Sequence, residues 1–316
     1  MSTQREVGKT DPNQHPRMTK KTKKSIFKHK HMLPYWLILP TLLLIGLLTI
    51  VPLGYSIYVS FQDFDTFGNP AGFTGSNYAD VLTSGTYWNS MGITFAYTFG
   101  VVAIEMFLGL VLALLVSKDS KVMGYLRWVL IIPMMVSPLV VGIIFRLMLN
   151  ADMGIANYML SAIGLPEINF LGTSLNAFLS IMLVDIWQWT PMCFLIILAG
   201  LQSLPQDPYE AARLDGASKL QVLRDITLPL LKPIIVVALV IRTMDALRMF
   251  DQVFVLTQGG PGRATEVISF LMYRVAMRFS DFGYAAAGLF ILLVFTILLS
   301  YIMVRTLNRN QKEGGV

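Results

Sequence analysis

Residues 203–233 read SLPQDPYEAARLDGASKLQVLRDITLPLLKP and join two strongly apolar stretches, residues 174–202 and 234–256. Connections between packed helices are usually short, roughly two to eight residues. This connection is much longer than a bare turn. It is therefore expected to form a structure of its own at one end of a bundle of apolar helices.

The first half of this connection carries the signals of a short helix. Asp207 can cap its beginning, Pro208 suits the first helical position, and Glu210 lies three residues after the cap, as in a capping box. The helix is expected over residues 208–214. Gly216 follows and is expected to end it, because glycine readily takes a positive φ.

A second helix is expected from Ser218 to about Ile226. Because proline interrupts a helix interior, Pro229 and Pro233 argue against one unbroken helix from the connection into the next apolar stretch. The prediction is a helix–turn–helix with small residues, which allow close approach, beside charged ones. These are Ala211, Ala212 and Ala217 beside Glu210, Arg213, Asp215 and Lys219. Such a surface suits docking to a partner.

The composition of the whole chain indicates a membrane protein. Of its 316 residues, 54% are hydrophobic and only 14% are charged, against about 25% charged in a typical soluble domain. This excludes an ordinary soluble enzyme, a disordered protein and a coiled coil. Six apolar runs have the length of a membrane span: residues 34–60, 89–116, 128–149, 174–202, 234–256 and 283–304. The expected fold is an all-α, polytopic bundle of six transmembrane helices over residues 34–306.

The distribution of Lys and Arg predicts how the bundle is oriented. Residues 61–88 and 150–173, on one side, contain none, whereas the opposite side carries most of them, nine in residues 1–31 alone. By the positive-inside rule, the tails at residues 1–33 and 307–316 are both cytoplasmic. A basic tail can also bind nucleic acid, but beside membrane spans it is expected to contact anionic lipid instead.

The residues needed for most catalytic and metal sites are missing from the spans. The histidines are His15, His29 and His31, all in the N-terminal tail, and Cys193 is the one cysteine. There is no G-x-x-x-x-G-K-[ST] phosphate loop, since residues 8–10 imitate only its end. The chain is thus expected to have no catalytic residues, no metal site and no nucleotide site of its own.

Residues 203–233 resemble the EAA loop of permease subunits of binding-protein-dependent ABC importers. The matching positions are Glu210-Ala211-Ala212-x-x-Asp215-Gly216-Ala217 and Ile226-x-Leu228-Pro229, whereas Leu223 stands where the family often has Phe. A second patch resembles the carbohydrate-uptake subclass, which includes maltose and glycerol-phosphate permeases: Phe250-Asp251 and Leu256-Thr257-x-Gly259-Gly260-Pro261. The resemblance extends over roughly residues 34–306.

The resemblance implies a type I importer permease fold in a bacterial or archaeal plasma membrane. It implies four kinds of partner: a second permease, two ATPase subunits that use ATP and Mg, an extracytoplasmic sugar-binding protein, and the lipid bilayer. The EAA helix would dock in a cleft of an ATPase subunit through Glu210, Ala211, Ala212, Asp215, Gly216, Ala217 and Pro229. The chain would move a di- or oligosaccharide, of trehalose or maltose type, or alternatively glycerol phosphate bound by Arg248.

Four ionisable residues in the fifth span need partners, because charges are costly in the membrane. Arg242, Asp245, Arg248 and Asp251 follow one another at steps of three with alternating sign, so neighbours can pair on a helix. One interpretation is a self-satisfied ladder that fixes packing, which is favoured for Arg242. The other is that Asp245, Arg248, Asp251 and Gln252 line the substrate pathway. The sequence leaves both open.

The fourth span offers a cluster suited to sugars. Asp185, Trp187, Gln188 and Trp189 combine aromatic faces for C–H surfaces with carboxylate and amide groups for hydroxyls. The alternative is a packing pair of tryptophans beside Pro191. Asp185 and Trp187 lie about 200° apart on a helix, so the four cannot all face one cavity.

The connections on the opposite side are expected to contact the binding protein, namely residues 61–88 and 257–281, with a tight turn at residues 259–262. An ion-driven secondary transporter is the rival class. It usually carries paired repeats, none of which is visible in the sequence, and it would leave the EAA segment unexplained.

Overall fold

The computed structural model describes residues 24–117 and 121–313, most of them in helices. The first 23 residues of the expected basic tail and the last three of the chain lie outside the described residues. The chain divides into two units, Met1–Tyr55 and Ser56–Val316. Helix α1 runs through the boundary between them, and the cavities and ion pairs described here lie in the second unit.

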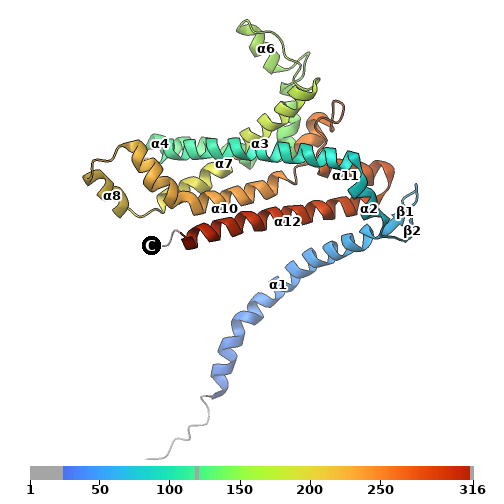
Figure 1. Cartoon of the computed structure of the whole chain (residues 1–316), viewed down its shortest axis with the longest axis horizontal. Coiled ribbons are helices and arrows are strands. Elements are labelled where there is room, and N and C mark those ends of the chain that lie inside the picture. Colours follow the sequence, from blue (N-terminus) through green and yellow to red (C-terminus); the bar gives the residue numbers. More distant parts are fainter. Residues whose placement is uncertain (1–23, 118–120, 314–316) are drawn as a thin grey trace, which may run out of the picture. The chain divides into compact units, whose positions relative to one another are not determined.

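Long apolar helices confirm the expected membrane-spanning class (Figure 1). Five helical stretches are long and apolar enough to cross a membrane, and a bent pair brings the number to six among the described residues. The stretches belong to α1 (Lys24–Ser60), α3 (Gly85–Val116), α7 (Ser174–Gln202), α10 (Leu228–Ala246) and α12 (Phe282–Glu313), and the bent pair is α4 (Lys121–Met135) with α5 (Pro138–Met148).

The third expected span is not one straight helix. Helices α4 and α5 meet at an angle of 92° across Val136 and Ser137. Pro138 occupies the first turn of α5, where a missing N–H costs nothing, and it disfavours helical geometry in the residue before it. The prediction of a continuous span over residues 128–149 was therefore wrong in its geometry, although its apolar composition was read correctly.

The fifth expected span, residues 234–256, is also interrupted. Helix α10 ends at Ala246, the next four residues are not helical, and the chain resumes as a short helix that contains the π-helical turn η2 (Val253–Thr257). Irregular backbone at membrane depth is tolerated where it is buried in protein or lines a cavity. This break places Leu247–Phe250 where a cavity is found.

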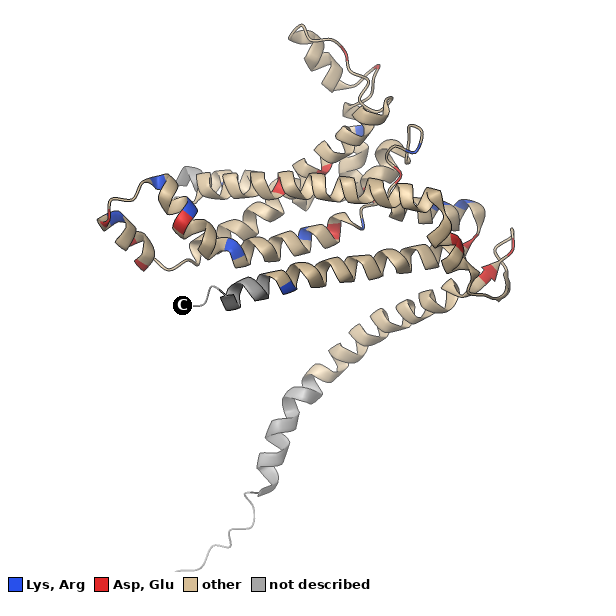
Figure 2. Ribbon diagram, viewed as in Figure 1, with Lys and Arg blue, Asp and Glu red and all other residues tan. Residues whose placement is uncertain are grey.

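Smaller elements lie at the two ends of the bundle. At one end are α8 (Asp207–Leu214), α9 (Lys219–Gln221) and the π-helical turn η1 (Val222–Thr227). At the other end are β1 (Gln62–Phe64), β2 (Pro70–Phe73), α2 (Ser76–Thr83) and α11 (Ile268–Phe279), whereas α6 (Ile155–Ala162) projects away from the bundle (Figure 1). Strands β1 and β2 form an antiparallel hairpin in which Gln62 pairs with Phe73. Charged residues gather at the two ends, and few lie between them (Figure 2).

Helices α3, α7 and α10 pack on one another and form the centre of the bundle. Small residues allow close approach: a Cβ on Gly109 of α3 would lie 2.8 Å from Cβ of Cys193 on α7. Lipid is as apolar as the helix surface, so the hydrophobic effect does not drive helices together inside a membrane. Close backbone packing of this kind stabilises helix pairs there instead. The buried core around Tyr97, Val101 and Ile181 surrounds the polar groups described next.

Candidate functional site: a polar cavity between two broken helices

A buried ion cluster centred on Arg242 joins α3, α7 and α10. The Nε and Nη2 atoms of Arg242 donate hydrogen bonds to the two carboxylate oxygens of Glu105 at 2.6 and 3.0 Å. Nη2 also pairs with Asp185, and Nη1 lies 3.0 Å from Oδ2 of Asp245. The guanidinium carbon lies 5.5 Å from the centre of the Trp189 ring, within range of a cation–π interaction.

The cluster gives Arg242 a structural role, as favoured from the sequence. Arg242, Glu105 and Asp185 are almost completely buried, whereas the side chain of Asp245 is 43% exposed. Buried charges are stable only when paired and hydrogen-bonded. The Arg242–Asp245 step of the predicted ladder is confirmed. The pairs with Glu105 and Asp185 join residues far apart in the sequence, so residue spacing could not reveal them.

A chain of hydrogen bonds connects this cluster to the break in the third span. The amide of Gln252 donates to Oδ1 of Asp185 and to Oε1 of Gln188, both at 3.1 Å. The amide of Gln188 donates in turn to the carbonyl oxygen of Val136 at 2.9 Å. Carbonyls at a helix end lack helical partners, so this side chain satisfies one that the break releases. Polar side chains thus link the two broken spans.

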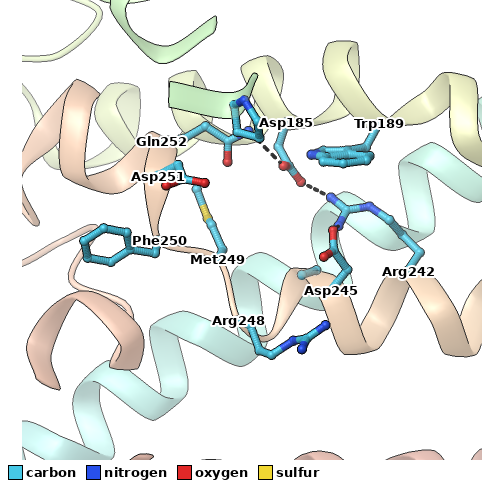
Figure 3. Close-up of a pocket in the computed structure, with 11 residues that line it drawn as sticks. Asp185, Trp189, Arg242, Asp245, Arg248, Met249, Phe250, Asp251 and Gln252 are labelled. Carbon is cyan, nitrogen blue, oxygen red and sulfur yellow. Dashed lines mark hydrogen bonds and ion pairs between the residues drawn. The ribbon is translucent and has the colours of Figure 1, made fainter. Parts of the chain in front are cut away.

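A cavity of about 260 Å³ opens beside the cluster, at the break in the fifth span (Figure 3). It is lined by Pro138, Asp185, Trp189, Arg242, Asp245, Ala246, Arg248, Met249, Phe250, Asp251 and Gln252. The structure therefore brings together six of the eight pathway candidates: Asp185, Trp189, Asp245, Arg248, Asp251 and Gln252. Carboxylate, guanidinium and aromatic groups all face one space at membrane depth.

The predicted ladder does not continue past Asp245, because α10 ends at Ala246. Arg248 is exposed and its Nε donates to the carbonyl oxygen of Met244 at 3.1 Å. Asp251 is half-buried. Within the described part of the chain, neither Arg248 nor Asp251 forms an ion pair. These two residues offer charged groups to the cavity that the protein itself does not neutralise.

The remaining two candidates, Trp187 and Gln188, do not line the cavity. The helical spacing of the four candidates in α7 had already indicated that they could not all face one cavity. Gln188 is buried behind it in the hydrogen-bond chain described above. Trp187 is 45% exposed and packs against Phe145, with ring centres 5.2 Å apart. It lines a separate, mainly apolar cavity of about 360 Å³ together with Pro133 and Pro191.

The connection between α7 and α10 forms the expected short helix with a sharp stop. Helix α8 ends in a Schellman motif: Ala217 N–H donates to Ala212 O, and Gly216 N–H donates to Arg213 O. Gly216 has φ of +72°, which explains glycine at this position. The side chains of Glu210, Ala211 and Asp215 are exposed, as is Pro229, whereas Ala212 is buried and Ala217 half-buried.

Two details of this connection were predicted wrongly. Helix α8 begins at Asp207, one residue early, and its N-cap Gln206 makes no side-chain cap, so the capping box expected at Asp207 is absent. The capping box lies instead at Ser218 and Gln221: the Ser218 N–H donates to Oε1 of Gln221 at 2.8 Å, and the Gln221 N–H donates to Oγ of Ser218 at 3.4 Å.

Pro229 and Pro233 do not break the helix between connection and span. The stretch Lys219–Ala246 is continuous because the π-helical turn Val222–Thr227 precedes Pro229. A π turn shifts the hydrogen-bond register and accommodates backbone groups that proline leaves without partners. The hydroxyl of Tyr209 donates to Oγ1 of Thr227 at 3.1 Å, which fastens α8 to this turn.

At the opposite end, residues 257–267 contain the tight turn that was predicted at residues 259–262. Gly259 and Gly262 both have positive φ, and the Gly260–Pro261 bond is cis. Buried Glu266 holds the turn: it pairs with Arg274 at 2.6 Å and with Arg263 at 3.7 Å. The turn is thus shaped by its own ion pairs. No group of three His, Cys, Asp or Glu side chains among the described residues is placed to hold a metal.

Comparison with known proteins agrees with this architecture. The family of binding-protein-dependent transport system inner membrane components matches residues 105–312. The trehalose/maltose transport system permease protein MalF of Thermococcus litoralis is 40% identical over 86% of this chain and 92% of its own length. The sulfoquinovosyl glycerol transport system permease protein SmoG of Agrobacterium fabrum is 34% identical over 87% and 90%.

A solved structure shares the fold. A chain of a bacterial ABC transporter involved in import of the acidic polysaccharide alginate superposes with a TM-score of 0.76, at 21% identity, over 92% of this chain and 99% of that one. The family match over residues 105–312 and the 40% identity to a permease aligned over 92% of its length show the family of this chain. The chain belongs to the family of binding-protein-dependent transport system inner membrane components, the permease subunits of ABC importers.

Proposed function

We propose that this permease moves a neutral di- or oligosaccharide into the cytoplasm, through the cavity between the two broken helices. The observation that carries the proposal is the set of uncommitted polar groups facing this cavity. Asp251 and the second oxygen of Asp245 can accept hydrogen bonds from hydroxyls, and Arg248 can donate them. Trp189 adds an aromatic surface for C–H groups. A polyhydroxylated ligand matches this mixture.

The relatives support a sugar. MalF of Thermococcus litoralis is named for trehalose and maltose transport, and SmoG for transport of sulfoquinovosyl glycerol. Glycerol phosphate, the alternative raised by the sequence, would need a strong cationic site. Arg242 is already bound by three carboxylates, which leaves Arg248 as the uncommitted guanidinium in the cavity lining. The lining therefore favours the neutral sugar.

Import would be driven by ATP hydrolysis in separate subunits, with ATP and Mg bound by two ATPase subunits rather than by this chain. Helix α8 is the proposed docking element. It presents Glu210, Ala211 and Asp215 to solvent, and Leu214 beside them is 89% exposed. An exposed Leu within a charged rim is typical of a protein-binding surface. Tyr209 and the Schellman stop keep the element rigid.

A second permease subunit is proposed to cover the open side of the cavity. Arg248 is exposed on this chain although it lies between apolar helices. Ionisable groups at membrane depth face protein or water rather than lipid. A neighbouring permease that closes the cavity would remove Arg248 from lipid and complete the pathway.

The proposed orientation follows the positive-inside rule, with both termini and α8 in the cytoplasm. An extracytoplasmic sugar-binding protein would then meet the opposite end. Residues 61–88, which contain the β1–β2 hairpin, and residues 257–281, with the turn held by Glu266, would contact it.

Sugar uptake into proteoliposomes that contain the complete transporter tests the proposal. ATP-dependent uptake of radiolabelled trehalose or maltose is expected with the binding protein present. Glu210→Lys reverses a charge on the docking surface, and Gly216→Asp puts an anion at the unfavourable C-terminal end of α8. Both variants are expected to hydrolyse ATP without uptake. Normal uptake by both, in assembled complexes, would disprove the coupling role, and wild-type complexes that import no sugar would disprove the function.

A further inference from the structure

We infer that the cavity between the broken helices selects sugars by charge, and that Asp251 and Arg248 set this selection in opposite directions. The inference rests on the proposed sugar function and adds a rule of exclusion: sugars that carry a phosphate or carboxylate are rejected at this site. It is drawn from the charges that line the cavity and from which of them are already neutralised.

The first step is that Arg242 cannot serve an anionic ligand. Both oxygens of Glu105, one of Asp185 and one of Asp245 occupy its guanidinium. The cluster holds one cation among three carboxyl groups, so it offers no spare positive charge to a ligand. An anion that approached Arg242 would meet these carboxylates at the same time.

The second step concerns the groups that remain available. Asp251 forms no ion pair within the described residues, and only Oδ2 of Asp245 is engaged by Arg242. Arg248 bonds a backbone carbonyl and no carboxylate. In Figure 3, Arg248 lies beyond Asp245 on one side of the cavity, and Asp251 lies near Gln252 on the other. The free carboxylate oxygens therefore outnumber the free guanidinium.

The third step is the balance of charge. Of the groups that line the cavity and are not bound by Arg242, the carboxylate of Asp251 and one oxygen of Asp245 are negative, and the guanidinium of Arg248 is positive. Charges interact strongly where little water screens them. An anionic sugar would be repelled by Asp251 and by the free oxygen of Asp245 and attracted by Arg248 alone, whereas a neutral sugar would only exchange hydrogen bonds with water for hydrogen bonds with these side chains. The sign of the lining thus acts as a filter.

Asp251 is the residue at which this filter can be tested most cleanly. Asp245 also holds Arg242, so its removal would disturb the cluster. Asp251 forms no ion pair with Arg242, and Asp251→Asn keeps the shape of the side chain while removing one negative charge. Arg248→Gln removes the uncommitted positive charge and should act in the opposite direction. Asp152→Asn removes an exposed carboxylate away from the cavity and is the matched control.

The experiment compares trehalose with trehalose 6-phosphate, two ligands of one skeleton that differ in charge. Equilibrium dissociation constants are measured on the complete transporter in detergent without the binding protein, so that the selectivity of that protein plays no part. The readout is the ratio of the constant for the phosphate to that for the neutral sugar. Asp251→Asn is expected to lower this ratio about tenfold and Arg248→Gln to raise it about tenfold. Asp152→Asn should leave it within about twofold.

Each outcome decides. A ratio that stays at the wild-type value in both cavity variants would overturn the inference, as would wild-type binding of the phosphate in preference to trehalose. Unchanged ratios would leave the proposed sugar function intact, whereas a preference for the phosphate would leave sugar import intact and contradict only the neutral charge of its substrate. Wild-type transporter that binds neither trehalose nor maltose and imports no sugar would overturn the proposed function, and the inference with it.

Discussion

The ion cluster around Arg242 and the exposed surface of α8 contain the same kinds of side chain in opposite settings. In the cluster, Arg242 is bound by Glu105, Asp185 and Asp245, and three of these four residues are almost fully buried. On α8, Glu210 and Asp215 face solvent, and neither forms an ion pair within the described residues.

The difference separates two uses of charge. Where a charge is fully buried, as in the Arg242 cluster, the fold itself must neutralise it, so its loss should damage the structure. On a surface in water a charge costs little to keep free, so its loss should damage recognition and leave the fold intact. Substitutions in the buried polar network should therefore lower the stability of the whole bundle, whereas substitutions around α8 should have local effects only.

Arg242→Met should give the largest effect. It leaves Glu105, Asp185 and Asp245 without their common cation, and breaking a buried charge network costs about 3–5 kcal/mol. The thermal midpoint of the purified complex, followed by fluorescence, should fall strongly. Adding Glu105→Gln and Asp185→Asn to Arg242→Met should recover much of the loss. An unchanged midpoint in the single variant would mean that the cluster does not hold the bundle together.

Gln188→Leu should destabilise less, because it removes hydrogen bonds rather than a charge. The carbonyl of Val136 and one N–H of Gln252 lose their partners, at a cost of about 1–3 kcal/mol. The same melting experiment measures it. Leu179→Met, an exposed position on the same helix, is the control. If the two variants melt alike, the hydrogen-bond chain contributes nothing to joining the two broken spans.

Gly216→Ala should act locally. Its φ of +72° suits glycine, and a Cβ there would contact nothing within 4 Å, so the cost of about 1–2 kcal/mol comes from the backbone alone. Amide hydrogen exchange should accelerate in α8 while α7 stays protected. Gly216→Asn tolerates this conformation better and should exchange more slowly than the alanine variant. Equal exchange in all three proteins would contradict the assignment of a left-handed stop.

Ser218→Ala should give the smallest effect. It removes one half of the capping box with Gln221, and loss of such a cap costs about 1 kcal/mol. Faster hydrogen exchange should be confined to residues 219–227, with the melting temperature of the complex nearly unchanged. Ser218→Asp retains a cap and serves as the comparison. A marked drop in melting temperature would show that this end of α10 supports the whole bundle.

Hydropathy was sufficient to predict which parts of the chain form the bundle, and for α7 it predicted both ends, Ser174 and Gln202. The breaks at Val136–Ser137 and at Leu247–Phe250 were missed, because apolar composition does not report helix direction. Pro138 was visible in the sequence and was the available signal for the first break. The second break, at Leu247–Phe250, contains no proline or glycine, so no local signal in the sequence indicated it.

The candidate site was predicted in part for a similar reason. Helical spacing indicated that Arg242 and Asp245 could pair, and they do. It could not indicate that Glu105 pairs with Arg242, since the two residues are 137 positions apart and lie on different helices. Gln188 and Gln252 were named as pathway candidates, but the sequence could not indicate that they join the two breaks, because their partners are set by packing rather than by local sequence. The short helix α8 and its glycine stop were easier to predict, because the residues that form them are neighbours in the sequence.

Because the π-helical turn at Val222–Thr227 leaves the helix unbroken, the end beside α8 and the end beside the cavity belong to one rigid rod. The continuous stretch Lys219–Ala246 contains 28 residues, about 42 Å at the rise of a helix. Tyr209 attaches α8 to one end through Thr227, and the other end stops where Asp245 and Arg248 meet the cavity. If a partner of α8 tilted this stretch by a few degrees, its length would turn the tilt into a displacement of several ångströms at its other end. That end carries the charges that line the cavity.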